Sequence, residues 1–161
     1  ADNRTYTLTV QTQQRKIEVK DILVGQVWLC GGQSNMNYSA AQGITDMQEE
    51  LQKPMNPTIR LFTVTRNSSP WYQEECEGKW QVCNAKSALW FSAVGYFFGK
   101  TLSEALSQPV GLINASWGGS PVETWTPASS MSKEPALKEC GPKTGRVKVP
   151  TTTRSDQCTM P

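Results

Sequence analysis

Ser34 is the residue of this sequence best placed to act as a nucleophile. It lies in residues 31–36, Gly-Gly-Gln-Ser-Asn-Met, directly after an apolar run that ends at Cys30. A serine between a buried strand and a helix can project its hydroxyl into a crevice, and paired glycines allow a substrate to approach closely. Such a serine could be the nucleophile of a serine esterase, although a helix cap is the more frequent role for a segment of this kind taken alone. The alternative role is a helix cap, because Ser and Asn are favoured caps, and the segment is not the Gly-x-Ser-x-Gly elbow of the α/β-hydrolases.

A second segment with related chemistry spans residues 117–125, Trp-Gly-Gly-Ser-Pro-Val-Glu-Thr-Trp. Gly118 and Gly119 follow a short apolar strand and can expose backbone N–H groups where a tetrahedral intermediate carries its negative charge. The alternative is an ordinary strand–helix turn, with Pro121 at the first helical position and both tryptophans in the core.

The sequence of 161 residues contains no histidine. Most hydroxyl nucleophiles in hydrolases depend on an imidazole as their base. We therefore expect a site built on Ser34 to take its base from residues outside this sequence.

The elements that would position these segments follow from the spacing of apolar residues. Alternation predicts half-exposed strands at 5–10 and 16–20, which we expect to belong to a sheet that begins earlier in the protein. The next strand is predicted at 24–29, and residues 27–30 form an almost unbroken apolar run, which is typical of a strand covered on both faces in a parallel sheet. Further strands are predicted at 59–64 and 110–114, and helices at 36–51 and 89–106.

The order of strands and helices predicts an α/β fold with parallel strands and right-handed crossovers. Sites in such sheets form at the carboxyl ends of the strands. Ser34 and the Gly118-Gly119 pair each follow such an end, so we expect them to meet.

Together the two segments resemble the sialate O-acetylesterases of the SGNH (GDSL-like) hydrolase superfamily. The likeness rests on residues 24–36, Val-Gly-Gln-Val-Trp-Leu-Cys-Gly-Gly-Gln-Ser-Asn-Met, and on residues 111–125, which begin Gly-Leu-Ile-Asn-Ala-Ser. The resemblance implies a flavodoxin-like parallel sheet, present in part, and no cofactor or metal. It also implies that Ser34 is the nucleophile, that the N–H groups of Ser34, Gly118 and Gly119 form the oxyanion hole, and that the substrate is O-acetylated sialic acid or a sialoglycan, cleaved through an acetyl-enzyme.

The same resemblance implies a partner. The family's Gln-Gly-Glu-Ser segment and its Asp-x-x-His pair come later than the matched residues and do not occur here. Sialate O-acetylesterases occur as a small and a large chain cut from one precursor, so we expect the catalytic Asp and His to come from a second chain in a heterodimer, or else from sequence missing here. Residues 1–21 then resemble the end of a β-rich domain, 22–125 the N-terminal part of the esterase domain, and 126–161 a loop-rich tail packed on missing sequence.

Five cysteines suggest an oxidising compartment. Cys76 could pair with Cys83 and Cys140 with Cys158, which leaves Cys30 as a buried free thiol; pairing of a tail cysteine with another polypeptide is the alternative. Of four glycosylation sequons, those at Asn3 and Asn67 lie in polar surroundings, whereas glycans at Asn37 or Asn114 would collide with the site or the core. We expect a glycoprotein of the secretory pathway, either lysosomal or extracellular.

Composition narrows the remaining alternatives. A net charge of +2, with basic and acidic residues interspersed, argues against nucleic acid, and no apolar run reaches the roughly 20 residues of a membrane span. Two other functions stay open. One is a catalytically silent glycan-binding or scaffold module, and the other is an acetyl esterase that acts on a different acetylated carbohydrate.

Overall fold

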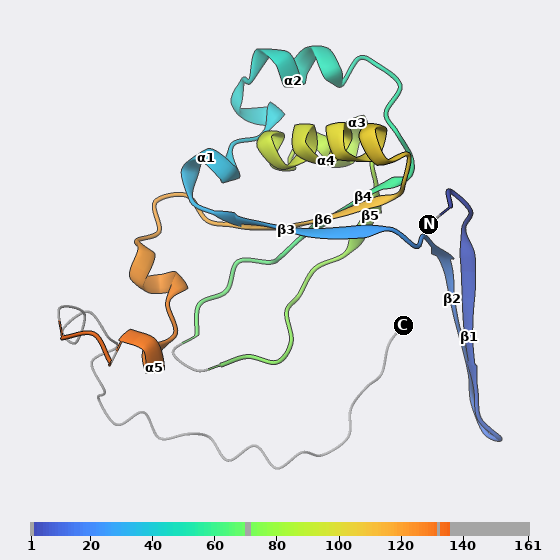
Figure 1. Ribbon diagram of the computed structural model, residues 1–161, viewed down its shortest axis with the longest axis horizontal. Coiled ribbons are helices and arrows are strands. Elements are labelled where there is room, and N and C mark those ends of the chain that lie inside the picture. Colours follow the sequence, from blue (N-terminus) through green and yellow to red (C-terminus); the bar gives the residue numbers. More distant parts are fainter. Residues whose placement is uncertain (1, 70–71, 132, 136–161) are drawn as a thin grey trace. The chain divides into compact units, whose positions relative to one another are not determined.

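A computed structural model of the chain describes residues 2–69, 72–131 and 133–135 (Figure 1). The chain divides into two compact units, Ala1–Ser120 and Pro121–Pro161. The elements of the first unit are β1 (Tyr6–Gln11), β2 (Lys16–Ile22), β3 (Gln26–Gly32), α1 (Ser34–Asn37), η1 (Ala40–Gln42), α2 (Thr45–Glu50), β4 (Ile59–Thr63), β5 (Trp80–Val82), α3 (Ala85–Ala88), α4 (Ala93–Leu106) and β6 (Val110–Ser116). The described part of the second unit contains η2 (Val122–Trp125) and α5 (Ala128–Met131).

The main sheet has the strand order β3-β6-β4-β5, with β3, β6 and β4 parallel and β5 antiparallel to β4. The predicted α/β class with parallel strands is therefore confirmed. In the register of this sheet, Gly32 at the end of β3 stands beside Ser116 at the end of β6. This pairing brings the two glycine-containing segments to one edge.

β1 and β2 form an antiparallel hairpin, as the alternating pattern predicts. The turn is closed by the Thr12 N–H, which donates to the Arg15 carbonyl at 2.8 Å. Every residue of β1 is exposed, and so is β2 apart from its half-buried last residue. Within the described residues this sheet has two strands, so neither of its faces is covered.

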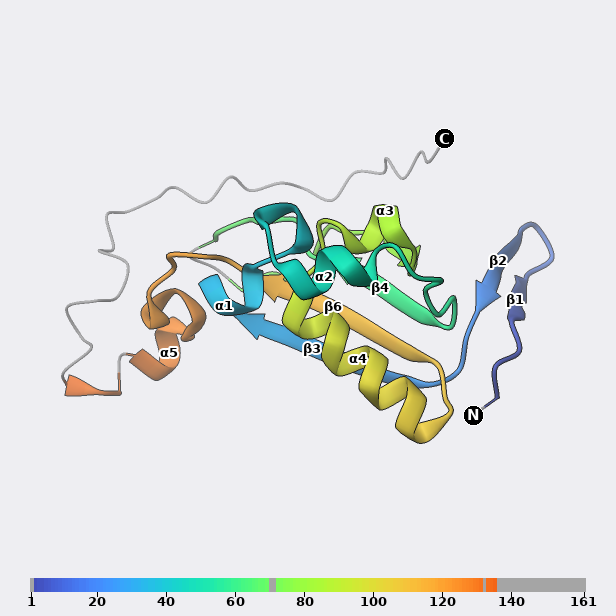
Figure 2. The ribbon, with the colours of Figure 1, turned by 90° about the horizontal axis from the view of Figure 1, so that it is seen from above.

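Helices cover one face of the main sheet, and α4 lies over β6 and β3 (Figures 1 and 2). Contact is close because α4 places glycines against the strands: a Cβ on Gly99 would stand 2.5 Å from a Leu112 methyl carbon, and one on Gly95 would stand 3.2 Å from the Cys30 sulfur. The core beneath the helices is made of Cys30, Ala40, Met47, Ile59, Leu61, Cys83, Ala88, Phe91, Ala93, Tyr96, Val110 and Leu112.

The opposite face of the sheet is open among the described residues. Val27 is 63% exposed and Leu29 is 70% exposed, so the expectation that this strand is covered on both faces is wrong for the described chain. Trp80 of β5 partly shields this face, since a Cβ on Gly111 would stand 3.1 Å from its ring. β3 is a parallel strand, as its apolar residues predict, but its burial is confined to the helix-covered face, where Cys30 lies.

The helix expected at 36–51 is broken into α1, η1 and α2. Gly43 has a φ of 88°, a left-handed conformation that ends η1. Ser39 begins η1 as its cap, and its backbone N–H donates to the Gln42 side chain at 2.9 Å. The helix expected at 89–106 is confirmed from Ala93 onward. It starts late because the Ser92 hydroxyl caps it, accepting from a backbone N–H at 3.0 Å.

A buried carboxylate joins α2 to α4. Glu50 accepts from the Lys100 ammonium, from the Tyr96 hydroxyl at 3.0 Å and from Lys53 at 3.2 Å. These donors, Lys100 foremost, hold the pKa of Glu50 below its ordinary value although burial acts in the opposite direction. Burial and the same carboxylate raise the pKa of Tyr96.

The described cysteines are all free thiols. The expected Cys76–Cys83 pair is therefore absent, with Cys83 buried under the helices and Cys76 exposed. Burial raises the pKa of Cys83 to about 12. The expectation of a buried free thiol at Cys30 is confirmed, whereas the Cys140–Cys158 pair lies outside the described residues.

Within the described ranges, no helix is both long and apolar enough to cross a membrane. The same residues contain no cluster of three or more His, Cys, Asp or Glu side chains suited to a metal ion.

Candidate active site

Ser34 lies directly beyond β3, as the first residue of α1, and its side chain is exposed. The capping position of α1 belongs to Gln33, and no side chain caps this helix. The Ser34 hydroxyl makes no hydrogen bond within the described part of the chain. Its backbone N–H belongs to the first helical turn, whose N–H groups have no intrahelical acceptor. The alternative of Ser34 as the helix cap is therefore not realised, and both its hydroxyl and its N–H remain available.

Gly32 fixes the direction in which the chain leaves β3. Its φ of 146° is a conformation that side-chain-bearing residues rarely adopt, and a Cβ there would stand 3.3 Å from the Met36 Cβ. Its carbonyl accepts a 3.0 Å hydrogen bond from the Trp117 N–H. The end of β3 is thus tied directly to the residue before Gly118.

Gly118 lies against Ser34. A Cβ on Gly118 would stand 3.6 Å from the Ser34 Cα, 4.0 Å from the Ser34 Cβ and 3.8 Å from the Asn37 Nδ2. Gly119 has a φ of 77°, and the turn is closed by the Ser120 N–H, which donates to the Trp117 carbonyl at 3.4 Å. Within the described residues, the N–H groups of Gly118 and Gly119 have no acceptor, so they are free to donate to a ligand.

The structure thus brings together Ser34, Gly118 and Gly119, the three residues expected to form the nucleophile and its oxyanion-binding groups. The alternative reading placed both tryptophans of this segment in the core, and this is wrong, because Trp117 is 40% exposed and Trp125 is 45% exposed. Pro121 stands just before η2 rather than inside it.

Two further side chains lie beside Ser34: Asn37, which the sequence placed near the site only as a sequon, and Arg66, which sequence reasoning missed. The Asn37 Oδ1 accepts a hydrogen bond from the Arg66 guanidinium, which also lies 5.9 Å from the centre of the Trp117 ring. Two signals could have found them: Asn37 follows Ser34 by three residues, a spacing that puts two side chains on one face of a helical turn, and Arg66 follows the carboxyl end of a strand.

The four sequons divide as expected between exposed and enclosed positions. Asn3 and Asn67 are exposed, whereas Asn114 is buried and accepts from the Ser116 hydroxyl at 2.6 Å. Asn37 is half-buried and its amide is engaged beside Ser34. A glycan would displace these contacts at Asn37 or Asn114, but it could be accommodated at Asn3 and Asn67.

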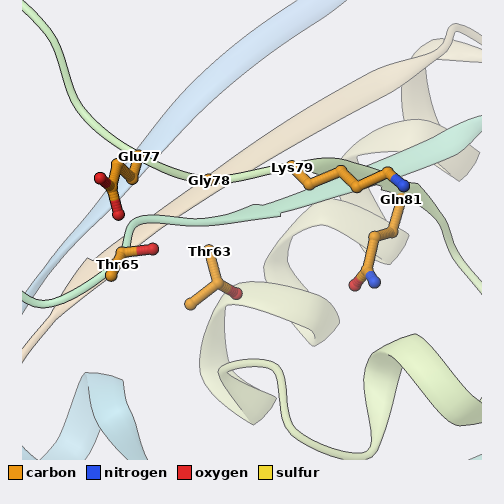
Figure 3. Close-up of a pocket in the computed structure, with 6 residues that line it drawn as sticks. All are labelled: Thr63, Thr65, Glu77, Gly78, Lys79 and Gln81. Atoms are coloured by element: carbon orange, nitrogen blue, oxygen red, sulfur yellow. The ribbon is translucent and has the colours of Figure 1, made fainter. Parts of the chain in front are cut away.

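A shallow hollow lies elsewhere, where the chain beyond β4 runs beside the chain that enters β5 (Figure 3). It is lined by Thr63, Thr65, Glu77, Gly78, Lys79 and Gln81. The Thr65 N–H donates to the Glu77 carbonyl at 2.8 Å, so the hollow sits on a continued strand pairing. None of residues 31–36 or 117–125 lines it.

Comparison with known proteins agrees with this geometry. Residues 24–140 match the family described as "Carbohydrate esterase, sialic acid-specific acetylesterase". This match covers both glycine-containing segments and more than half of the chain. The chain belongs to this family.

Individual members of the sialic acid-specific acetylesterase family are similar at a moderate level of identity. The chain is 33% identical to the sialate O-acetylesterase of Rattus norvegicus over 83% of its own length and 25% of the relative. For the Homo sapiens sialate O-acetylesterase the identity is 32%, over 81% of this chain and 26% of the relative. A crystal structure of a carbohydrate acetylesterase from Xanthomonas citri superposes with a TM-score of 0.74 at 37% identity, covering 80% of this chain and 30% of that one.

The chain therefore spans about a quarter of the length of the curated family members that it matches. Its matched part contains Ser34, Gly118 and Gly119, and its sequence contains no histidine.

Proposed function

We propose that this chain supplies the nucleophile side of a sialate O-acetylesterase, with Ser34 forming an acetyl-enzyme. The observation that carries the proposal is the contact between Gly118 and Ser34, at 3.6 Å from a Cβ position on the glycine to the Ser34 Cα. A side chain at residue 118 would fill the space beside the hydroxyl, whereas glycine leaves that space to a substrate. The matching family supports the choice of an acetyl ester as the substrate.

The reaction would begin with the Ser34 hydroxyl attacking the acetyl carbonyl carbon while its proton passes to a base. The carbonyl oxygen then becomes an oxyanion, which the N–H groups of Ser34, Gly118 and Gly119 stabilise. Collapse of this intermediate releases the sugar hydroxyl, which takes up the proton, and leaves acetyl-Ser34. Water then attacks the acetyl group, giving acetate and the free serine.

The base and its orienting carboxylate come, in this proposal, from a histidine and an aspartate on a second chain of the same precursor. The chain's lack of histidine and its coverage of a quarter of its relatives support this division. We further propose a secretory location, lysosomal or extracellular, supported by the exposed sequons at Asn3 and Asn67. A denaturing gel and intact masses of native material, reduced and unreduced, should reveal a companion chain. Activity from preparations that contain this chain alone would contradict the need for an imported histidine.

A fluorophosphonate probe tests the nucleophile in the native enzyme. We expect a single labelled peptide that contains Ser34, and no labelling after Ser34→Ala. Ser68→Ala is the matched control, since Ser68 is also exposed but lies in the loop that follows β4; its labelling should equal that of the wild type. Labelling that persists in Ser34→Ala would exclude this residue as the nucleophile.

The substrate class is tested separately, by measuring acetate release from O-acetylated sialic acid and from an acetylated neutral sugar. The proposal expects the higher kcat/KM for the sialic acid. A clear preference for the neutral sugar would favour an esterase of other acetylated carbohydrates. The similarity to the carbohydrate acetylesterase from Xanthomonas citri is the reason for testing this alternative.

A further inference from the structure

Three neighbouring strands deliver polar groups to one edge of the main sheet. Ser34 follows β3, Gly118 follows β6 and Arg66 follows β4, and these strands are adjacent and parallel. The segment after β4 is held to this edge, because the Val64 N–H donates to the Asn114 carbonyl at 2.9 Å. Arg66 therefore belongs to the same edge as the nucleophile, although it comes from a part of the chain that carries neither glycine-containing segment.

The Arg66 guanidinium is held against both of those segments. It donates to the Asn37 Oδ1 in the turn that begins at Ser34, and it lies 5.9 Å from the centre of the Trp117 ring, next to Gly118. The Asn37 amide nitrogen in turn faces Gly118, at 3.8 Å from a Cβ position there. A flexible side chain is thereby held beside the nucleophile, which lowers the entropy that it loses when it binds a ligand.

Within the part of the chain that the structure describes, the charge of Arg66 is not balanced by an acidic partner. Among the described residues, the ion pairs of this chain join Arg4 to Asp2, Lys16 to Glu18, Lys53 and Lys100 to Glu50, and Arg60 to Asp21. Arg66 takes part in none of them. Its side chain is exposed, and a guanidinium has five N–H donors, most of which remain after the bond to Asn37.

An acetyl ester is neutral, and the oxyanion that forms from it is served by backbone N–H groups, so acyl transfer itself does not call for a guanidinium. Sialic acid differs from neutral sugars in carrying a carboxylate. A guanidinium matches a carboxylate with two parallel hydrogen bonds, a geometry that an ammonium does not provide. Resting on the proposed function, we propose that Arg66 binds the substrate's carboxylate and so selects acetylated sialic acids over acetylated neutral sugars.

The experiment compares Arg66→Met with the wild type in the native two-chain enzyme. The substrates are an O-acetylated sialic acid and the methyl ester of the same compound, whose carboxylate is masked. For the free acid we expect kcat/KM to fall about 10- to 100-fold, mostly through KM, because a hydrogen-bonded charge pair is lost. The loss for the methyl ester should be about threefold or less.

Arg15→Met is the matched control, because Arg15 is an exposed arginine in the β1–β2 turn, and both substrates should be cleaved as by the wild type. A second variant, Asn37→Asp, places a carboxylate against the guanidinium, and it should likewise weaken cleavage of the free acid more than that of the methyl ester. Equal losses on the two substrates in Arg66→Met would overturn the inference, as would no loss on either.

A binding measurement separates this inference from the proposed function. Calorimetric titration with unacetylated sialic acid, the reaction product, should give a dissociation constant at least 10-fold weaker in Arg66→Met than in the wild type. If acetate release is absent but this difference holds, the esterase function fails and the carboxylate site stands. If acetate release depends on Ser34 but Arg66→Met binds sialic acid as the wild type does, the function stands and the inference fails.

Discussion

The helix-covered face of the main sheet and its carboxyl edge differ in residue type and in exposure. Under α4 the strands present apolar side chains that are almost fully buried, such as Leu112 at 0% exposure. At the edge the chain presents an exposed serine, two glycines and an arginine without an acidic partner among the described residues. The difference teaches that stability and chemistry reside in separate parts of one sheet. Substitutions should therefore affect one property and spare the other.

The largest effect is expected at the edge, on activity alone. Ser34→Ala should lower kcat in the native enzyme by on the order of 10⁶-fold, the size of loss found when a triad nucleophile is removed. The free energy of unfolding should change by about 0.5 kcal/mol or less, because the Ser34 side chain is exposed and makes no hydrogen bond within the described chain. Kinetics with denaturant unfolding of the same preparations checks both values. A large loss of stability in Ser34→Ala would show that the carboxyl edge also contributes to stability, contrary to the comparison.

The next effect belongs to the covered face. Leu112→Ala should cost about 2–5 kcal/mol in the free energy of unfolding, since it removes a buried side chain packed against Gly99 of α4. Leu29→Ala, on the open face of the neighbouring strand, is the matched control and should cost about 0.5 kcal/mol or less in this chain by itself. Urea titration of both variants measures the contrast. Equal costs would mean that the open face is buried in solution.

A smaller effect tests Glu50, the one charged side chain that is buried among the described residues. The pKa of Glu50 is lowered in the folded chain, so its carboxylate contributes stability above the unfolded value of about 4.5, and this contribution is lost as the pH falls through the folded pKa. At pH 7, Glu50→Gln should cost about 1–3 kcal/mol, because the Lys100 and Lys53 ammonium groups lose their charged partner.

Denaturant unfolding at several pH values measures this dependence. The difference between wild type and Glu50→Gln should shrink as the pH falls below about 4.5. Glu49→Gln, one residue earlier and exposed, should stay within about 0.5 kcal/mol of wild type throughout. A difference that does not vary with pH would mean that the cost reflects packing rather than charge.

The smallest effect is expected at the turn beside the nucleophile. Gly119→Ala should cost about 1 kcal/mol of stability, because the φ of 77° is unfavourable for a residue with a side chain although nothing lies within 4 Å of the added Cβ. Gly31→Ala is the matched control, also with open space but without a positive φ, and it should unfold as the wild type does. Thermal unfolding resolves the two. Equal behaviour would show that the turn relaxes around the alanine.

The sequence predicted those parts of the molecule whose position is dictated by burial. Residues 110–114 could be placed as a strand because a short apolar run indicates a buried strand. The proximity of Ser34 and Gly118 could be predicted because parallel strands end at the same edge of a sheet. Arg66 escaped prediction because exposed polar side chains follow no period. The helix at 36–51 was overextended because Gly43 and Ser39 are compatible with a weak helical pattern, and only their backbone conformation reveals the breaks. Apolar composition also could not tell that β3 has one open face.

The pairing of Gly32 with Ser116 fixes the register of β3 against β6, and the distance between Ser34 and Gly118 depends on this register to the single residue. A strand rises about 3.3 Å per residue, so a slip of one position would move Gly118 farther from Ser34 than a hydrogen bond can stretch, and it would turn the neighbouring side chains to the wrong face. Loops such as the one between α2 and β4 can lengthen without moving either partner. A deletion of one residue inside β3 or β6 would leave all the site's groups present but unable to act on the same carbonyl.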